Sequence, residues 1–462
     1  MAEHRDDEGA AATARLLDDA AGRAARYLAE LDGRAVAPAR TALERLEALD
    51  GPVPEDGADP ADIIALLDDV GAPATVASAG PRYFGFVTGG ALPAALAANW
   101  LAGAWDQNAF SAVSSPVAAA LEARALVWVA ELLGLPADCG GGLVTGATMA
   151  NFTGLAAARH AVLEQAGWNV EARGLAGAPP VSVVAGAEAH ASLLKALALL
   201  GLGRETVIRV PADGQGRMRA EALPEIARPA IVCLQAGNVN TGAFDPAAEV
   251  IAAARAAGAW VHVDGAFGLW AAAAPGRAHL TAGFDGADSW ALDAHKWLNV
   301  PYDSGIALVR RPEALAAAMS MDAAYLPTGG QRDPFDFTPE ASRRMRGVEV
   351  WAALKSLGRR GLAALVERNC RQAARFAEGL GTAGFEVLNE VVLNQVLVSF
   401  GAPEATQRVI AGLQAEGTCW CGGTTWQGRP AMRISVSSWA TGDRDVERSL
   451  EAMIRVARAE GA

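Results

Sequence analysis

The stretch WVHVDGAFG, residues 260–268, joins a short apolar run to a turn that begins at Asp264. Similar short apolar runs lie between alanine-rich stretches of helical pattern, at residues 143–145, 181–186, 206–210, 230–235, 289–293 and 305–310. Such an alternation predicts an α/β fold built on a doubly wound, mainly parallel sheet. Because most of these runs are apolar throughout rather than at every second residue, we expect helices to cover both faces of the sheet.

The pattern changes on either side of this central region. Residues 1–80 show apolar positions at helical spacing and predict an N-terminal helical arm, followed by a large α/β domain over residues 81–311. Residues 312–462 contain a polar loop, a long helical stretch, two strand-like segments (VLVSF and MRISVSS) and a final helical stretch. They predict a small α+β domain.

The composition excludes several classes of protein. The chain has 462 residues, of which 52% are hydrophobic and 20% charged, so it is expected to be globular rather than disordered. Its net charge of -13 argues against nucleic acid as a partner, since binding to a phosphate backbone needs a basic face. No apolar stretch reaches the roughly 18 residues of a membrane span, and the N-terminus lacks the pattern of a signal peptide, so we expect a cytoplasmic protein. The five cysteines are scattered, which makes a disulfide framework or a structural metal site improbable.

Lysine is rare in this chain. Of 39 basic residues only Lys195, Lys296 and Lys355 are lysines. Arginine can replace lysine on a solvated surface but cannot act as an amine nucleophile. A lysine kept in such a chain is therefore a candidate for covalent chemistry.

Polar residues follow several of the predicted strands. Thr148 stands where a helical stretch begins, so its hydroxyl can either cap the helix or help the free N–H groups bind a phosphate. His190 and Asp264 also follow or end strands, and each has a structural alternative to a role in a site. His190 can cap the helix that follows it, and Asp264 can be a turn residue. Lys296, preceded by His295, follows another strand. Since ligands of open α/β sheets bind at the carboxyl ends of the strands, the conjunction favours one site.

These segments, in their order along the chain, resemble a known family. The similarity rests on TGAT, AH with SLLKA, NVNTGAFDP, HVDGAFG and DAHKW, and extends from PRYFGFVTGG to MRISVSSWATGDRDVE. The chain resembles the group II amino-acid decarboxylases that depend on pyridoxal 5'-phosphate (PLP), which include aromatic-L-amino-acid, tyrosine and glutamate decarboxylases. The resemblance implies fold type I, with a mainly parallel seven-stranded sheet in a PLP-binding large domain, and a homodimer with shared active sites.

The resemblance also implies catalytic roles. Lys296 would bind the cofactor aldehyde covalently and, once released, would transfer protons. Asp264 would pair with the pyridine nitrogen and keep it protonated, so that the ring accepts electrons. His190 would stack on the ring near the carboxylate that leaves as carbon dioxide. A neutral imidazole at that position favours decarboxylation over transamination, because a clamping arginine would hinder departure of the carboxylate.

Further residues are implied to hold the cofactor. Ala147 and Thr148 would bind its phosphate, and Ala266 would lie against the second ring face. His295 would contact the phosphate or the substrate carboxylate. Asn238 stands near the position expected for the ring hydroxyl.

The substrate pocket is less well defined by the resemblance. Tyr83 and Phe84 align with residues that line the side-chain pocket, and Asn108 and Phe110 align with positions supplied by the neighbouring subunit. Arg82 is interpreted as a surface arginine in preference to a substrate anchor. Aromatic and acidic amino acids both remain possible substrates.

Two departures from the family concern the reaction. Asp293 replaces a common asparagine and puts a carboxylate near the phosphate. The loop over residues 327–341 offers Phe335 and Phe337 where aromatic decarboxylases have a proton-donating tyrosine, while Tyr325 precedes it in a segment expected to be structural. The expected product is an amine. The alternatives are decarboxylation with oxidative deamination to an aldehyde, and a non-catalytic PLP-fold binding module.

Overall fold

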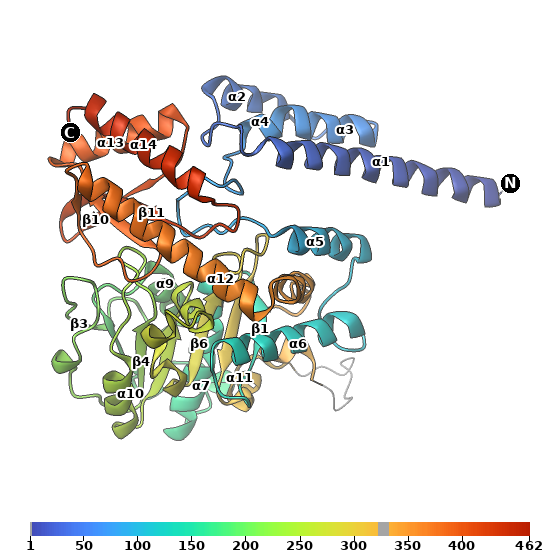
Figure 1. Ribbon diagram of the computed structural model, residues 1–462. Helices are drawn as coiled ribbons and strands as arrows, with labels where there is room; N and C mark the ends of the chain where they lie inside the picture. Colours follow the sequence, from blue (N-terminus) through green and yellow to red (C-terminus); the bar gives the residue numbers. More distant parts are fainter. Residues whose placement is uncertain (1, 322–331) are drawn as a thin grey trace.

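A computed structural model describes residues 2–321 and 332–462 of the chain (Figure 1). Tyr325 and the first part of the loop expected at residues 327–341 lie outside the described residues. Three regions follow one another along the chain: a helical arm, a domain with a large sheet and a smaller domain with a second sheet.

The large sheet has seven strands in the order β1-β7-β6-β5-β4-β2-β3. Its strands are β1 (Gly140–Val144), β2 (Ser182–Gly186), β3 (Ile208–Val210), β4 (Ala230–Gln235), β5 (Trp260–Asp264), β6 (Ser289–Asp293) and β7 (Gly305–Val309). Only β7 runs antiparallel to its neighbours, β1 and β6. The predicted fold class is confirmed, and the bounds of β4, β5 and β6 agree with the predicted runs residue by residue.

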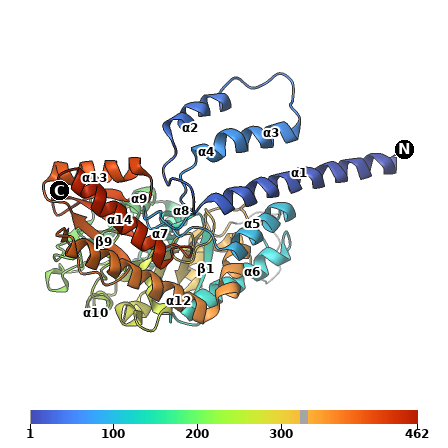
Figure 2. The ribbon, with the colours of Figure 1, turned by 45° about the horizontal axis from the view of Figure 1, so that its top comes forward.

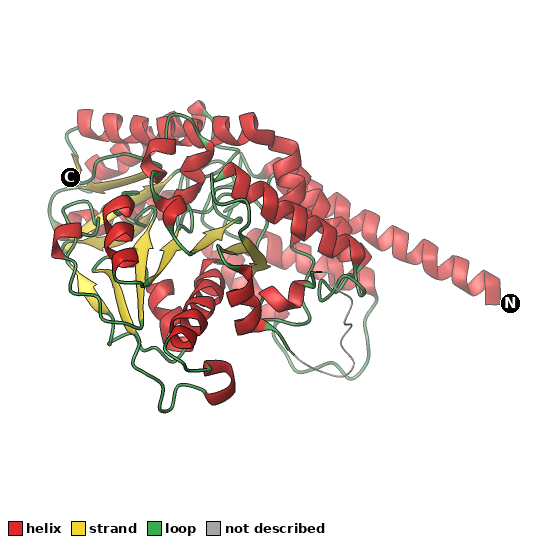
Figure 3. Ribbon diagram, turned by 90° about the horizontal axis from the view of Figure 1, so that it is seen from below, coloured by secondary structure: helices red, strands yellow, loops and turns green. Residues whose placement is uncertain are grey.

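Helices cover both faces of this sheet (Figure 3). One face packs against α7 (Ala147–Gln165), α8 (Val170–Arg173), α9 (Ala191–Leu199) and α11 (Pro312–Met319). The other face packs against α6 (Pro116–Leu132), α10 (Ala247–Ala256) and α12 (Gly347–Thr382). Every residue of β4 to β7 is buried, as expected for strands that are apolar throughout.

The smaller domain contains a four-stranded antiparallel sheet in the order β10-β11-β9-β8. Its elements are β8 (Glu386–Val387), β9 (Gln395–Ser399), α13 (Pro403–Glu416), β10 (Gly422–Trp426), β11 (Arg429–Ser435) and α14 (Asp443–Ala459). The sheet, α12, α13 and α14 share one apolar core. Cys419 and Cys421, two residues apart, are both buried in that core.

The N-terminal arm projects from the body of the molecule (Figures 1 and 2). It consists of α1 (Ala2–Glu30), α2 (Arg40–Glu44), α3 (Pro60–Leu66) and α4 (Ala72–Ala74), and α5 (Pro93–Trp105) follows it. Short helical turns complete the chain, at η1 (Arg45–Leu49), η2 (Leu67–Gly71), η3 (Ala220–Ala222), η4 (Gly268–Ala273), η5 (Ala278–Thr281), η6 (Phe284–Gly286) and η7 (Pro334–Phe337). Among the described residues, no helix combines the length and apolarity needed to cross a membrane.

Arg82 joins the arm to the smaller domain. Its guanidinium lies 2.7 Å from a carboxylate oxygen of Asp32 and 3.2 Å from one of Asp445, and it donates to the Thr418 carbonyl. The side chain is only 2% exposed. The interpretation of Arg82 as a surface arginine is therefore wrong, because three distant segments of the chain meet around it.

Candidate active site

The ends of the central strands and two helix N-termini form one polar site. Thr148 is the second residue of α7, His190 directly precedes α9, Asp264 ends β5, and Lys296 lies in the turn after β6. The charges of Asp264, Lys296, Arg433 and Asp293 all act on the pKa of His190, which indicates how closely these groups lie. The structure thus brings together the catalytic residues expected from the sequence, and adds Arg433 from β11.

A chain of buried hydrogen bonds ends on Asp264. The indole N–H of Trp260 donates to the Ser289 hydroxyl, which lies 2.8 Å from Nδ1 of His262. Nε2 of His262 lies 2.8 Å from the Asn151 side-chain oxygen, and the Asn151 amide donates to Oδ2 of Asp264 over 3.1 Å. All five residues are buried. Their donors therefore point in one direction, toward the carboxylate.

His262 is a neutral member of this chain of hydrogen bonds. Complete burial lowers its pKa to about 3, so the imidazole carries one proton at neutral pH. That proton is on Nε2 if the Ser289 hydroxyl donates to Nδ1, which leaves the Asn151 amide free to donate to Asp264.

Asn151 and His262 were not predicted as site residues. His262 lies two residues before Asp264 in β5 and so points to the same face of the sheet, and Asn151 lies one helical turn after Ala147. These spacings were the only signal in the sequence.

His190 caps a helix and also lies at the polar site. Its Nδ1 accepts the backbone N–H of Ser192 over 3.2 Å and thereby caps α9. The proton of the neutral ring is consequently on Nε2. Burial lowers the pKa of His190 below its usual value, while the charge of Asp264 raises it. A neutral imidazole with a free N–H is therefore present at the site.

Asp293 is the centre of a second group of contacts. Its Oδ1 accepts the backbone N–H of Ala147 over 2.5 Å and lies 3.3 Å from Nε2 of His295. Its Oδ2 lies 3.0 Å from Nζ of Lys296. Since Nδ1 of His295 accepts the Ser304 N–H, the proton of this imidazole is on Nε2 and faces Asp293. An amine, an imidazole N–H and a helix N-terminus therefore converge on one carboxylate.

The backbone of Lys296 is closely enclosed. A Cβ atom built on Gly89 would lie 1.8 Å from the Lys296 carbonyl oxygen, so only glycine permits this approach. The segment before α5 thus packs directly on the turn that carries the lysine.

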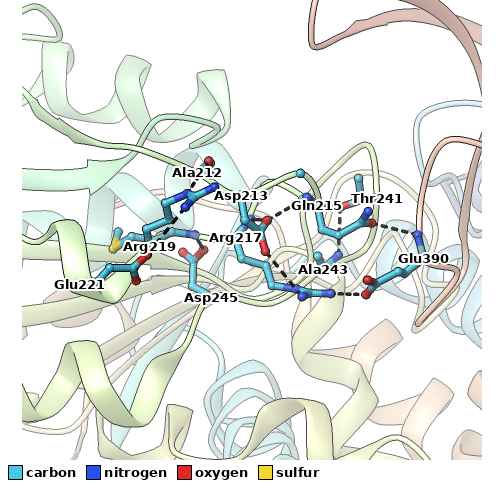
Figure 4. Close-up of polar contacts among 12 residues, drawn as sticks. Ala212, Asp213, Gln215, Arg217, Arg219, Glu221, Thr241, Ala243, Asp245 and Glu390 are labelled. Carbon is cyan, nitrogen blue, oxygen red and sulfur yellow. Dashed lines mark hydrogen bonds and ion pairs between the residues drawn. The ribbon is translucent and has the colours of Figure 1, made fainter.

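Asn238 is fully engaged in a turn. Its side-chain oxygen accepts the backbone N–H groups of Asn240 and Thr241, and its amide donates to Gln235. The neighbouring polar contacts hold this turn against the smaller domain, with Arg217 bridging Asp213 and Glu390 (Figure 4). The contacts of Asn238 are therefore structural, and its cofactor contact stays a prediction.

Aromatic rings stand on one side of the site. Tyr83 stacks on Trp420 with ring centroids 5.1 Å apart, and Phe86 lies 5.5 Å from the same indole. The ring centroids of Tyr302 and His295 lie 4.4 Å apart. Burial raises the pKa of Tyr83 to about 12, and the charge of Tyr302 also raises it. We call Tyr83, Phe86, Tyr302 and Trp420 the aromatic wall. Phe84, by contrast, lies in the core of the smaller domain against Phe376.

The loop between α5 and α6 carries the other predicted pocket residues. Asn108 is exposed, and its side-chain oxygen accepts the Arg343 N–H over 3.0 Å. Phe110 stacks on Phe335 with centroids 4.6 Å apart, and Phe335 is buried. The ring of Phe337 lies under the guanidinium of Arg332. In the described part of the chain, both phenylalanines of the predicted loop are thus packed.

These residues fit pyridoxal phosphate. The three donors around Asp293 already hold an anionic group at the N-terminus of α7, as a phosphate requires. The side chain of Lys296 is 17% exposed, and Ala266 lies in the turn that follows Asp264. When bound, this cofactor supplies an aldehyde for the lysine and an electron-accepting ring.

Comparison with known proteins identifies the family. The family model described as "Pyridoxal-dependent decarboxylase conserved domain" matches residues 44–402. Tryptophan decarboxylase 1 of Oryza sativa subsp. japonica is 28% identical over 78% of this chain and 77% of its own length. L-2,4-diaminobutyrate decarboxylase of Rhizobium meliloti (strain 1021) is 29% identical over 88% of this chain and 84% of its own.

A solved structure shares the whole fold. The crystal structure of Oryza sativa TDC with PLP and tryptamine superposes with a TM-score of 0.89, at 24% identity, over 97% of this chain and 98% of the other. The fold, the family model and the named relatives agree. The chain belongs to the pyridoxal-dependent decarboxylases and is an enzyme that uses pyridoxal phosphate to decarboxylate an amino acid.

Proposed function

We propose that Lys296 binds the cofactor covalently and that Asp264 and His190 act on its ring. The observation that carries this assignment is the position of the Lys296 amine beside the N-terminus of α7, at the sheet edge where Asp264 and His190 also lie. Lys195 and Lys355 are exposed on helices α9 and α12, away from this edge. Ala147, Thr148 and His295 hold the phosphate, and Ala266 supports the ring.

Chemical trapping tests the assignment. We expect the purified protein to be yellow and borohydride to fix the cofactor to the peptide that contains Lys296. Label on Lys195 or Lys355 would contradict the assignment, and Lys355→Ala is a suitable control that should keep the colour.

We further propose that the product is an amine. His190 holds a proton on Nε2 and can replace the lost carbon dioxide with hydrogen, so no oxidant is needed. The competing route consumes dioxygen and water and releases aldehyde, ammonia and hydrogen peroxide. An oxygen electrode separates the two routes, since amine formation under nitrogen supports the proposal and stoichiometric oxygen uptake contradicts it.

The aromatic wall supports an aromatic amino acid as the substrate. Each pair of contacting aromatic rings contributes about 0.5–1.5 kcal/mol in addition to the free energy of burying their surface, so the aromatic wall favours an aromatic side chain in the substrate. Incubation with each amino acid and mass analysis of the products tests this. Turnover of acidic or diamino substrates in preference to tryptophan, tyrosine and phenylalanine would contradict it.

A homodimer is supported by apolar surface on the arm and on α5. Leu17 of α1 and Trp100, Leu101 and Trp105 of α5 are 44–60% exposed. An apolar cavity of about 580 Å³ opens between α1, α5 and Trp439. Patches of this kind on a globular protein mark interfaces. A second copy that covers them would place two active sites near the shared interface, and a fully active monomer in sedimentation would contradict the proposal.

Two smaller assignments remain proposals. We propose a cytoplasmic location, which fluorescence of a tagged protein tests. We also propose domain boundaries at residues 80/81 and 311/312, supported by the change from arm to sheet and by the end of β7 at Val309, although α11 and the first part of α12 pack back on the large sheet. Limited proteolysis should cut near them before it cuts within the sheets.

A further inference from the structure

We propose that Asp293 competes with the phosphate of the cofactor for one set of donors, and that the protein therefore binds the cofactor less tightly than a variant with a neutral side chain at this position would. The inference rests on the proposed function, since it takes Lys296 and the N-terminus of α7 as the cofactor site. It concerns a residue at which this chain departs from the family pattern.

The geometry shows the competition directly. The Asp293 carboxylate accepts the Ala147 N–H, faces Nε2 of His295 and pairs with Lys296. These groups are the ones assigned to the phosphate and to the covalent bond. A phosphate and the Asp293 carboxylate cannot both use the Ala147 and His295 N–H groups, and Lys296 leaves Asp293 when it binds the cofactor.

The surroundings do not screen a second anion. The Asp293 side chain is only 3% exposed, so water contributes little. Its main chain is also fixed, because the Trp270 indole donates to the Asp293 carbonyl over 3.1 Å. Of the titratable groups, His295 and Lys296 contact Asp293 directly, and the charge of Asp293 also acts on the pKa of His190.

The charges around the site oppose a second anion. The two imidazoles are neutral, because burial lowers the pKa of both His190 and His295. Lys296 is then the cation that pairs with Asp293, and a phosphate dianion would add two negative charges beside this carboxylate. Asp293→Asn removes one negative charge and supplies an amide N–H that can donate to a phosphate oxygen.

Titration of cofactor binding tests the proposal. The probe is PLP itself, added to the apoenzyme between pH 7 and 9, where its phosphate is already a dianion. The dissociation constant is read from the absorbance of the bound cofactor. At pH 8 Asp293→Asn should bind PLP at least about tenfold more tightly than the wild type, a difference of about 1.4 kcal/mol.

Asp303→Asn is the matched control. Asp303 is 42% exposed, pairs with Arg346 and acts on His295 only through space. Removing its charge should leave the affinity for PLP within about twofold of that of the wild type. Pyridoxal, which lacks the phosphate, should gain no affinity from Asp293→Asn, whereas a gain equal to that of PLP would show that Asp293 acts only through Lys296 and would overturn the proposal.

The outcomes separate this proposal from the proposed function. Equal affinity for PLP in the wild type and Asp293→Asn, with borohydride label on Lys296 in both, overturns the role of Asp293 and leaves the function intact. Absence of label on Lys296 contradicts the proposed function itself. Circular dichroism of each apoenzyme shows whether the variants fold.

Discussion

Asn151 offers the sharpest test of how the site is built. It is completely buried in α7, accepts a hydrogen bond from His262 and donates one to Asp264. Asn151→Ala removes both bonds. Loss of a hydrogen bond to a charged group costs about 1.5–3 kcal/mol, and a buried donor left without an acceptor costs about 1–3 kcal/mol. We therefore expect Asn151→Ala to lower the free energy of unfolding by about 3–5 kcal/mol.

Thr153→Val is the control for this variant. Thr153 lies in the same helix, is equally buried, and donates only to the Met149 carbonyl within α7. Its replacement removes one neutral hydrogen bond and should cost about 0.5–1.5 kcal/mol. Urea unfolding of the apoenzymes at one protein concentration compares the two variants without any contribution from the cofactor.

Cofactor binding gives the second measurement. Because Asn151 orients the Asp264 carboxylate, Asn151→Ala should also weaken PLP binding, whereas Thr153→Val should not. Equal stability and equal PLP affinity in the two variants would refute the idea that the buried chain supports Asp264.

Three other variants test separate parts of the structure. Burial lowers the pKa of His262 to about 3 in the folded protein, so below pH 6.5 the unfolded chain binds more protons and the folded protein loses stability as the pH falls. His262→Gln lacks this group, so its free energy of unfolding should fall by about 3 kcal/mol less than that of the wild type between pH 7 and pH 4, as measured by urea unfolding. Arg82→Met leaves Asp32 and Asp445 without their buried partner and should lower the free energy of unfolding by about 3 kcal/mol, while Arg40→Met, at a fully solvated ion pair, should change it by less than about 1 kcal/mol. Phe335→Tyr should leave the ratio of amine to aldehyde unchanged, because the ring is buried against Phe110; a shift in that ratio, measured by mass, would show that this side chain reaches the reacting carbon.

The fold, and the polar residues at one edge of the sheet, could be predicted from the sequence. Strands β4, β5 and β6 are mainly apolar and each ends at a polar residue, so their bounds follow from the sequence pattern alone. Asp264 and Lys296 stand at such ends. Parallel strands bring their carboxyl ends to one edge, and this rule places both residues without any knowledge of their contacts.

Side-chain contacts between distant segments could not be predicted in the same way. The His262–Asn151 bond joins positions 111 residues apart, and Arg82 contacts partners 50, 336 and 363 positions away. Nothing in the residues beside Arg82 distinguishes a buried arginine from an exposed one. The sequence placed Asp293 near the phosphate, but only the structure shows that its carboxylate takes the donors of α7, His295 and Lys296.

The two buried carboxylates of the site are held in opposite ways, and this difference explains what each can do. Asp293 is paired with a cation, Lys296, within the protein. Asp264 receives hydrogen bonds only from neutral groups, the Asn151 amide and the Ala266 N–H, and within residues 2–321 and 332–462 no ion pair to it is found. A buried carboxylate that is hydrogen-bonded but unpaired strongly attracts a cation. We therefore expect Asp264 to favour a protonated ring nitrogen in the cofactor, and the neutral chain behind it to keep the carboxylate directed at that nitrogen without supplying a competing positive charge.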